Sequence, residues 1–428
     1  MAHTKTLTSL VTAALLGSTG LAAAQCADPV KIGVLHSLSG TMAISETTLK
    51  DTLLMLVEQQ HAKGGVLGCQ IEAVVVDPAS DWPLFAEKAR ELLTVSEVDV
   101  IFGSWTSVSR KSALPVLEEL NGLMFYPVQY EGEESSKNVF YTGAAPNQQA
   151  IPAVDYFLEE LGVEKFALLG TDYVYPRTTN NILEQYLQDK GIAKEDIFVN
   201  YTPFGHSDWA TIVGDVVALG EDGKQVGVIS TINGDANIGF YKELAAADIS
   251  ADDIPVVAFS VGEEELSGLD TSNLVGHLAA WNYFQSADTE ANAEFISAWK
   301  AFAGDERVTN DPMEAHYIGF NMWVNAVEAA GTTDVDAVRT AMYGQEFPNL
   351  TGGTSVMLPN HHLAKPVLIG EIQADGQFDI ISQTAEVPGD AWTDFLPESA
   401  KLKSDWKELD CGMYNTETNT CVQLTSNY

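Results

Sequence analysis

Basic residues are scarce in this chain. It contains 22 lysines and arginines against 60 aspartates and glutamates, which gives a formal net charge of −38 at pH 7. This balance argues against nucleic acid and anionic membrane surfaces as partners, because both carry charge of the same sign. The acidic residues are spread along the chain instead of forming a tail, a pattern typical of a well-solvated surface.

Long hydrophobic runs are lacking as well. The apolar stretch Leu7 to Leu16 is shorter than the ~18 residues of a membrane span. It follows Lys5 and precedes three small residues, Ala22 to Ala24, which is the pattern of an export signal. We therefore expect residues 1–24 to be a signal peptide and the protein to be periplasmic. A lipid anchor on Cys26 is the less favoured alternative, because glutamine precedes that cysteine where a small residue is expected.

Only four cysteines are present, and in an exported chain they indicate disulfides. Cys26 and Cys69 each stand just before an apolar run that reads as a strand. If those strands are parallel neighbours, both cysteines lie at the same sheet edge, within bridging distance. We expect the pairs Cys26–Cys69 and Cys411–Cys421, the second closing a small loop near the C-terminus. Free or differently paired thiols are the alternative.

Catalytic motifs are absent from the sequence. There is no Gly-x-Ser-x-Gly, no glycine-rich phosphate loop after a strand and no His-Glu-x-x-His. The adjacent pair His361-His362 falls in an expected turn, where surface polarity explains it better than a metal site. No nucleophile–base pair or metal-ligand set remains, so the sequence predicts binding without chemistry, no enzyme and no cofactor.

Strands and helices alternate along most of the chain. The apolar runs show no polar alternation, which is typical of parallel strands covered on both faces by helices. This pattern predicts an α/β protein with two doubly wound parallel-sheet lobes. The expected strands are 30–35, 71–76, 98–102, 123–126, 165–169, 196–200, 225–230, 256–259 and 275–280. Three helical stretches, 290–302, 313–330 and 335–342, follow the second series.

Polar and aromatic side chains follow two of the expected strands. Trp105, Thr106 and Ser107 come after one strand, and Pro127 to Gln129 come after the next. Ligands bind at the carboxyl ends of strands in open α/β sheets, so these loops predict a site for a small polar molecule. The run Glu263 to Glu265 also follows a strand. A solvated helix start explains most of this run, and Glu264 is the member that we expect to face the cleft.

Seven segments together resemble the periplasmic urea- and short-chain-amide-binding proteins of ABC transporters, in the type I, Leu/Ile/Val-binding-like class. They are Leu35–Ala43, Gly103–Ser107, Phe125–Gly132, Tyr141–Gln149, Gly170–Arg177, Ser230–Asp235 and Trp281–Phe284. The resemblance implies a type I periplasmic binding protein fold whose two lobes are joined by three crossover segments. It also implies an ABC transporter permease as the partner of the protein.

The resemblance suggests limits for the two lobes and a ligand. We expect lobe 1 to contain residues 25–145 and 284–345, lobe 2 to contain 146–283 and 346–400, and 401–428 to form a C-terminal tail. Urea is the expected ligand. Formamide, acetamide, a branched-chain amino acid or a role as an amide sensor are the alternatives. Pro127 to Gln129 stand where amino-acid-binding relatives carry small and hydroxyl residues, which argues against an amino acid.

The resemblance also assigns roles. Trp105 and Ser107 match an aromatic residue and a serine of the amide-binding relatives, and Tyr173 and Tyr175 match two tyrosines. Urea offers four N–H donors and one carbonyl acceptor, so a site for it needs many acceptors and few donors. The expected ligand-binding set is Trp105, Thr106, Ser107, Tyr126, Pro127, Gln129, Tyr173, Tyr175, Asp235 and Glu264.

Within this set, Ser107 is expected to donate to the carbonyl of urea, whereas Gln129 and tyrosine hydroxyls accept its N–H groups. Asp235 would accept two N–H bonds, and the rings of Trp105, Tyr126 and Tyr173 would form the walls. Purely structural roles are the alternatives for four of these residues: Tyr126 as a core residue, Pro127 as a residue that shapes the loop, Tyr175 packed on Pro176, and Asp235 as a helix cap.

Overall fold

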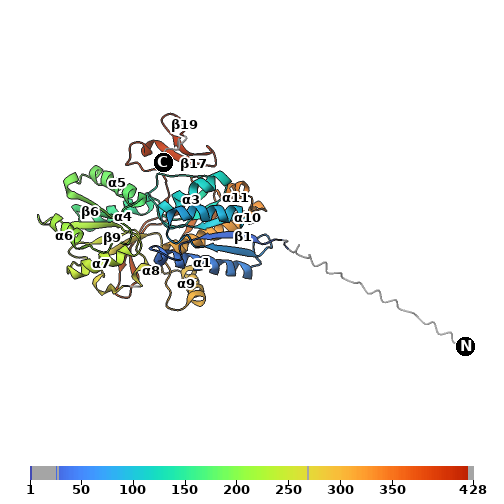
Figure 1. Cartoon of the computed structure of the whole chain (residues 1–428), viewed down its shortest axis with the longest axis horizontal. Coiled ribbons are helices and arrows are strands. Elements are labelled where there is room, and N and C mark those ends of the chain that lie inside the picture. The colour runs from blue at the N-terminus through green and yellow to red at the C-terminus, as the bar shows by residue number, and fades with distance from the viewer. Residues whose placement is uncertain (2–25, 27, 268, 423–428) are drawn as a thin grey trace.

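The computed structural model describes residues 1, 26, 28–267 and 269–422, which form two lobes side by side (Figure 1). Apart from Met1, the expected signal peptide lies outside the described residues, and so does the end of the chain after Val422. No helix of the described ranges has the length and hydrophobicity needed to cross a bilayer. No group of three or more metal-ligating side chains occurs in them either.

Lobe 1 is built on a five-stranded parallel sheet with the strand order β2-β1-β3-β4-β5. Its strands are β1 (Val30–Leu35), β2 (Ile71–Val76), β3 (Val100–Gly103), β4 (Met124–Tyr126) and β5 (Val139–Tyr141). Its helices are α1 (Ala43–Ala62), α2 (Trp82–Thr94), α3 (Ser107–Leu120), α9 (Glu290–Ala303), α10 (Asp311–Ala330) and α11 (Val335–Met342). Their apolar side chains share one core, in which β1, β3 and β4 are almost entirely buried.

Lobe 2 contains a seven-stranded sheet with the order β15-β14-β10-β9-β8-β6-β7. Its strands are β6 (Lys165–Thr171), β7 (Ile197–Thr202), β8 (Val226–Thr231), β9 (Val256–Ala258), β10 (Leu278–Trp281), β14 (Leu368–Ile372) and β15 (Phe378–Gln383). Its helices are α4 (Ala150–Glu159), α5 (Val174–Asp189), α6 (Ala210–Leu219), α7 (Ala236–Ala246) and α8 (Glu263–Leu266). Buried residues form two further clusters, one on each face of this sheet.

The last two strands of this sheet, β14 and β15, were not predicted, and both pair antiparallel. The sequence pattern predicts parallel strands joined by helices. The chain reaches β14 instead from a small sheet made of β11 (Glu346–Pro348), β12 (Thr354–Met357), β13 (Leu363–Lys365) and β16 (Val387–Pro388). No helical crossover precedes β14, so it can run against β10.

The chain crosses between the cores near residues 146, 285 and 366. Leu350, Met357 and Leu363 pack in the core of lobe 1, whereas Leu368 packs in lobe 2. From the sequence we expected the third crossing between the lobes at residues 345/346. The limits of the lobes remain a proposal, and we now propose the third crossing at residues 364–367.

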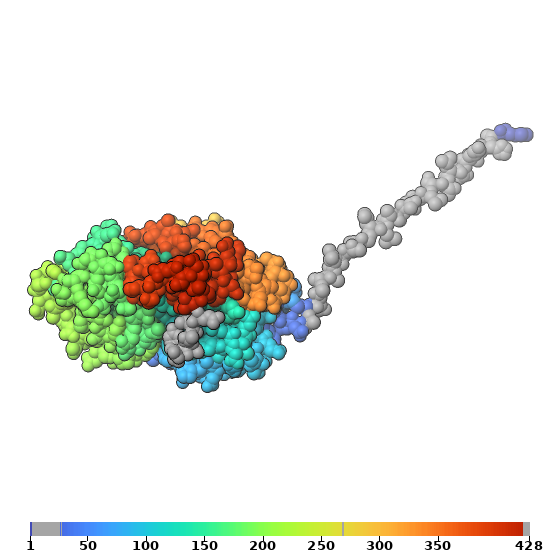
Figure 2. All heavy atoms as spheres, turned by 90° about the horizontal axis from the view of Figure 1, so that it is seen from above, coloured from blue at the N-terminus to red at the C-terminus, as the bar shows by residue number. Residues whose placement is uncertain are grey.

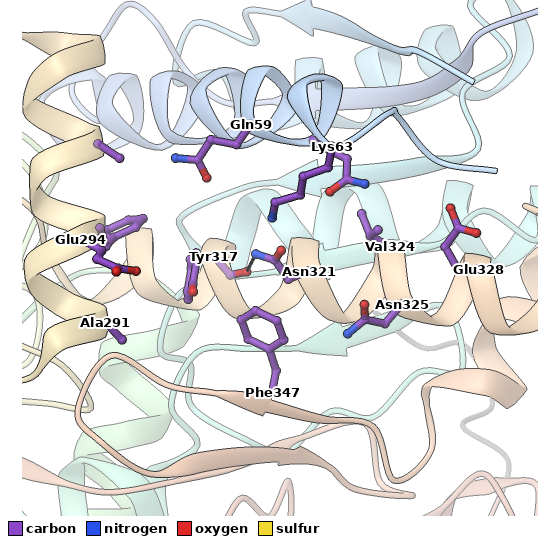
Figure 3. A pocket seen from close by; sticks show the side chains of 13 residues that line it. Gln59, Lys63, Ala291, Glu294, Tyr317, Asn321, Val324, Asn325, Glu328 and Phe347 are labelled. Atoms are coloured by element: carbon purple, nitrogen blue, oxygen red, sulfur yellow. Dashed lines mark hydrogen bonds between the residues drawn. The ribbon is translucent and has the colours of Figure 1, made fainter. Parts of the chain in front are cut away.

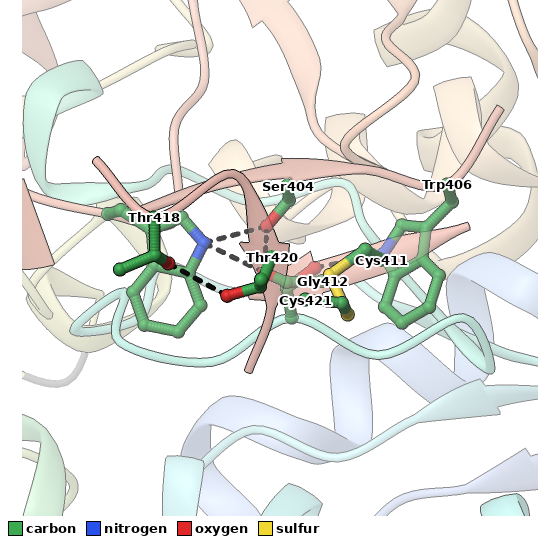
Figure 4. Close-up of a disulfide and its surroundings, with 9 residues drawn as sticks. Ser404, Trp406, Cys411, Gly412, Thr418, Thr420 and Cys421 are labelled. Atoms are coloured by element: carbon green, nitrogen blue, oxygen red, sulfur yellow. Dashed lines mark hydrogen bonds between the residues drawn. A yellow bond between two sulfur atoms is a disulfide. The ribbon is translucent and has the colours of Figure 1, made fainter. Parts of the chain in front are cut away.

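The C-terminal segment forms a three-stranded sheet of β17 (Leu402–Asp405), β18 (Cys411–Asn415) and β19 (Thr420–Cys421), and Figure 2 shows it lying over both lobes. Phe395, just before it, packs on Tyr186 of lobe 2 with ring centroids 4.6 Å apart. Trp406 donates from Nε1 to Ser135 Oγ of lobe 1 over 2.9 Å. Both expected disulfides, Cys26–Cys69 and Cys411–Cys421, are present, and Figure 4 shows the second beside Gly412.

The expectation that His361 and His362 lie on the surface is wrong. Both side chains are fully buried. His362 Nε2 lies 2.6 Å from the hydroxyl of Tyr130, and the His361 ring packs 4.2 Å from that of Phe140. Burial lowers the pKa of His361 to about 3 and that of His362 to about 4, so both rings are neutral at pH 7. They join the turn before β13 to β5 and to the loop after β4.

Candidate ligand-binding site

The strand order reverses at one place in each sheet. In lobe 1 the chain leaves β1 for β2 on one side and returns to β3 on the other, and in lobe 2 it does the same around β6. Such switch points open a crevice at the carboxyl ends of the strands, where ligands bind in α/β proteins. The loops after β1, β3, β6 and β8 lead to these switch points, and four of the ten expected site residues lie in them: Trp105, Thr106, Tyr173 and Asp235.

The two crevices face each other across a closed interface. The Trp82 ring of lobe 1 lies 5.2 Å from the Phe204 ring of lobe 2. Ser45 Oγ donates to Glu265 Oε1 across the same interface over 2.6 Å. Gly234, in the loop after β8, packs so closely on the loop after β1 that an added Cβ would stand 2.9 Å from the carbonyl oxygen of Thr41.

Trp105 enters the site from the tight loop after β3. A Cβ on Gly103 would lie 2.2 Å from the carbonyl oxygen of Leu35, so only glycine lets the end of β3 pack this closely on β1. The next residue, Ser104, has a positive φ of 65° and turns the chain away from the sheet. The Trp105 side chain is 2 % exposed, and its Nε1 has no hydrogen-bond partner among the described residues.

Helix α3 starts directly after this loop. The Thr106 Oγ1 caps it by accepting from the backbone N–H of Ser109 over 3.2 Å. Ser107, the first helical residue, is buried and donates from its hydroxyl to Glu131 Oε2. Thr106 therefore has a structural role at the helix end, whereas Ser107 belongs to a polar network that continues into the loop after β4.

That network is centred on Arg110, which is completely buried one turn after Ser107. Its Nε donates to Glu134 Oε1 over 2.7 Å, and its Nη1 to Ser107 Oγ over 3.3 Å. Lys111 Nζ donates to Glu134 Oε2 over 2.7 Å. Burial alone would raise the pKa of Glu134, but the charges of Arg110 and Lys111 hold it well below its usual value. Glu131 lies on the other side, its Oε1 3.7 Å from Arg110 Nη2 and 3.6 Å from Lys111 Nζ.

Tyrosine rings enclose the guanidinium. Its central carbon lies 4.5 Å from the ring centroid of Tyr126 and 4.8 Å from that of Tyr130. The Tyr126 hydroxyl donates to the carbonyl oxygen of Trp105. Burial raises the pKa of Tyr126 despite the opposing charge of Arg110, so this hydroxyl keeps its proton. The ring of Tyr126 thus packs in the core, and its hydroxyl is bonded to the loop that carries Trp105.

Gln129 connects this half of the site to lobe 2. Pro127 and Gln129 are both buried in the loop after β4. Gln129 Nε2 donates to Ser260 Oγ, in the loop after β9, over 2.6 Å. Its Oε1 is buried and unpaired within the described part of the chain.

Two tyrosines approach from lobe 2. Tyr175 lies in the first turn of α5, is 2 % exposed and has a hydroxyl with no hydrogen-bond partner in the described ranges. Burial raises its pKa, against the opposing effect of the nearby Gln129 and Ser260. The Tyr173 ring is half-buried and packs on Phe204 with centroids 4.9 Å apart.

Two expected residues lie apart from this group. Asp235 is exposed before α7 and makes no side-chain cap hydrogen bond. Glu264 lies 3.8 Å from Arg307 of lobe 1, and burial raises its pKa to about 7. The structure therefore brings eight of the ten expected residues together at or beside the interface between the lobes, and their contact with a ligand stays a prediction.

Sequence reasoning missed four residues of the site: Arg110, Glu131, Glu134 and Ser260. Arg110 could have been found, because its spacing from Ser107 and Ala113 places it on the buried face of α3. A buried arginine requires carboxylate partners, and the run Glu131 to Glu134 offers them.

A groove of about 620 Å³ lies elsewhere, on lobe 1 between α1, α9, α10 and β11 (Figure 3). Gln59, Lys63 and Glu294 point into it, with Tyr317 and Phe347 on its floor. None of the expected site residues lines it.

A family model described as a periplasmic binding protein domain matches residues 30–398. The chain belongs to this family. The two-lobed type I periplasmic binding protein fold expected from the sequence is thereby confirmed, and so is the expectation of a binding protein that is not an enzyme.

One relative named as a binding protein matches most of this chain, and a solved structure shares its fold. The chain is 23% identical over 379 residues to Leu/Ile/Val-binding protein homolog 6 of Brucella melitensis, an alignment covering 86% of this chain and 95% of that protein. It is 32% identical to limonene hydroxylase of Geobacillus stearothermophilus, but over only 31% of this chain and 24% of that protein. Among solved structures, a solute binding protein of an ABC transporter from R. palustris in complex with benzoate superposes with a TM-score of 0.75 at 18% identity, covering 85% of this chain and 99% of that one.

Proposed function

We propose that this protein captures urea between its two lobes in the periplasm and delivers it to the membrane permease of an ABC transporter. The observation that carries the proposal is the direction of the hydrogen bonds inside the site. Three buried side chains near the carboxyl ends of β3 and β4 already donate to the protein itself, so they have acceptor capacity left for a ligand.

The acceptors come from two segments, the start of α3 and the stretch that runs from the end of β4 into the next loop. The hydroxyl of Tyr126 donates to the Trp105 carbonyl, Gln129 Nε2 donates to Ser260, and the Ser107 hydroxyl donates to Glu131. Each oxygen of these side chains can still accept an N–H group. Urea brings four such groups in one plane, more than any amino acid or carboxylic acid of similar size.

The donors are fewer and suit one carbonyl. Trp105 Nε1 and the Tyr175 hydroxyl are buried and have no partner among the residues that the structure describes. A carbonyl oxygen has two lone pairs and can accept from both. Each buried polar group left unpaired would cost about 1–3 kcal/mol, so a ligand that pairs these groups gains affinity.

The charges beside the site favour a neutral ligand. Arg110 and Lys111 are balanced by Glu131 and Glu134, so this cluster offers a ligand no net positive charge. A carboxylate would also lie close to the buried Glu131. Benzoate, bound by the R. palustris relative, and the amino acids for which the Brucella relative is named both carry a carboxylate. Urea does not, and we place this chain apart from both on that ground.

Titration calorimetry on the purified exported protein tests the proposal, with urea, formamide, acetamide, leucine and benzoate injected separately. We expect urea to bind most tightly, with no release of ammonia. Heat from leucine or benzoate together with none from urea would contradict it. Copurification of the protein with its permease, increased by urea, would test delivery.

A further inference from the structure

The Ser107 hydroxyl has a fixed direction in this structure. It donates to Glu131 Oε2, and both side chains are buried, with relative exposures of 1 % and 0 %. The other carboxylate oxygen, Oε1, lies 3.7 Å from Arg110 Nη2 and 3.6 Å from Lys111 Nζ. A carboxylate between two cations only accepts hydrogen bonds, so the single proton of Ser107 points toward Glu131.

The same geometry decides what Ser107 can offer a ligand. A hydroxyl has one proton and two lone pairs. The proton goes to Glu131, and Arg110 Nη1, 3.3 Å away, donates to one lone pair. The remaining lone pair can accept from a ligand N–H. This reverses the expectation from the sequence, in which the hydroxyl of Ser107 donates to the ligand carbonyl.

We propose that Glu131 is a positioning residue that holds Ser107 as a hydrogen-bond acceptor and thereby makes the site select amides with an N–H group over carboxylates. The proposal rests on the proposed function and names the residue behind its specificity. A carboxylate ligand would set a lone pair against the lone pair of Ser107 and leave both unpaired.

The variant Glu131→Gln tests this assignment because its amide orientation can be anticipated. The amide oxygen favours the side of Arg110 and Lys111, since both are cations. Its NH₂ group then faces Ser107 and donates to it, so the hydroxyl proton turns toward the ligand. We expect urea to bind about 10-fold more weakly and the ratio of urea affinity to acetate affinity to fall by at least about 10-fold.

The matched control is Glu134→Gln, which changes the same charge cluster but makes no hydrogen bond to Ser107. Either variant leaves this cluster with one net positive charge, which favours acetate. We therefore expect the ratio of urea affinity to acetate affinity to fall in Glu134→Gln by this charge effect alone, and to be about 10-fold lower again in Glu131→Gln. Calorimetry gives both affinities, and circular dichroism checks that each variant is folded. If Glu131→Gln does not fold, Ser107→Ala replaces it, with the expectation that urea binding weakens while acetate binding does not.

The outcomes separate the two proposals. Urea binding by the unchanged protein, with a ratio in Glu131→Gln within about twofold of the ratio in Glu134→Gln, would overturn the role of Glu131 alone. In Ser107→Ala, an equal loss of affinity for urea and for acetate would also overturn the role of Glu131 alone. Preference of the unchanged protein for acetate or benzoate over urea, or binding of none of these, would overturn both.

Discussion

Glu263 gives the protein a stability that falls as the pH rises. The expectation that Glu263 to Glu265 form a solvated helix start is wrong, because Glu263 and Glu265 are buried. The Glu263 side chain is 1 % exposed at the start of α8, and its Oε1 accepts from the backbone N–H of Gln285 over 2.6 Å. Its Oε2 is unpaired within the described residues. Burial raises the pKa from 4.5 to about 8, although the N–H of Gln285 favours the charged form.

The direction of the effect follows from linkage between protonation and folding. The folded protein holds the proton of Glu263 up to about pH 8, whereas the unfolded chain releases it near 4.5. The stabilisation is therefore complete below pH 4.5 and is lost as the pH rises to 8. Each pH unit between the two values corresponds to about 1.4 kcal/mol, so the loss approaches about 5 kcal/mol as an upper limit.

Glu263→Gln carries a neutral amide in place of the acid and should lack this dependence. Free energies of unfolding should agree within about 1 kcal/mol at pH 4.5 and diverge by several kcal/mol at pH 8.5, with the variant more stable. Guanidinium chloride is the denaturant, because urea is the proposed ligand. The exposed Glu221 provides the control Glu221→Gln. Parallel curves for the original protein and Glu263→Gln would refute the reasoning.

Three further substitutions test the site and its supports. Trp105→Phe keeps an aromatic side chain, although a smaller one, and removes the unpaired Nε1 donor, so calorimetry should show urea binding about 5–30-fold weaker; an unchanged affinity would place the indole N–H outside the site. Arg110→Met leaves the carboxylate of Glu134 without its buried partner and should lower the free energy of unfolding by about 3–5 kcal/mol, whereas a loss below about 1 kcal/mol would contradict its role. Gly412→Ala sets a Cβ 2.4 Å from Trp406 Cζ2 and should cost about 1–3 kcal/mol, seen as faster proteolysis of the C-terminal sheet; equal rates would count against this packing.

Much of the fold could be predicted because buried strands and helices have recognisable patterns of apolar residues in the sequence. The strand at Val30–Leu35 is apolar except for Lys31, as expected of a central parallel strand, and the structure places it between two parallel neighbours. The antiparallel strands β14 and β15 left no such signal. Their direction is set by where the chain re-enters lobe 2 after the small sheet, and that depends on contacts between residues distant in sequence.

Part of the candidate site could also be predicted from local sequence. Post-strand position was enough to expect Trp105, Ser107 and Gln129 close to one another, since the carboxyl ends of the strands define the crevice. Their contact with a ligand stays a prediction. Post-strand position was not enough for Asp235, which follows β8 yet is exposed. Position along a loop does not determine which way a side chain points. The partnership of Ser107 with Glu131, 24 residues later, arises only when the loops after β3 and β4 come together.

The two lobes contribute unequally to the site, and this affects the order of binding. Every hydrogen-bond partner of Ser107 and Arg110 belongs to lobe 1 among the residues described, so these groups keep their orientation when the lobes separate. Lobe 2 adds the Tyr175 hydroxyl and Ser260, and Ser260 reaches lobe 1 through one hydrogen bond to Gln129. A preorganised half-site lowers the entropic cost of binding, because fewer side chains must be ordered. Under the proposed function, urea should therefore bind first to lobe 1 of the open protein, and closure of lobe 2 should follow and bury it.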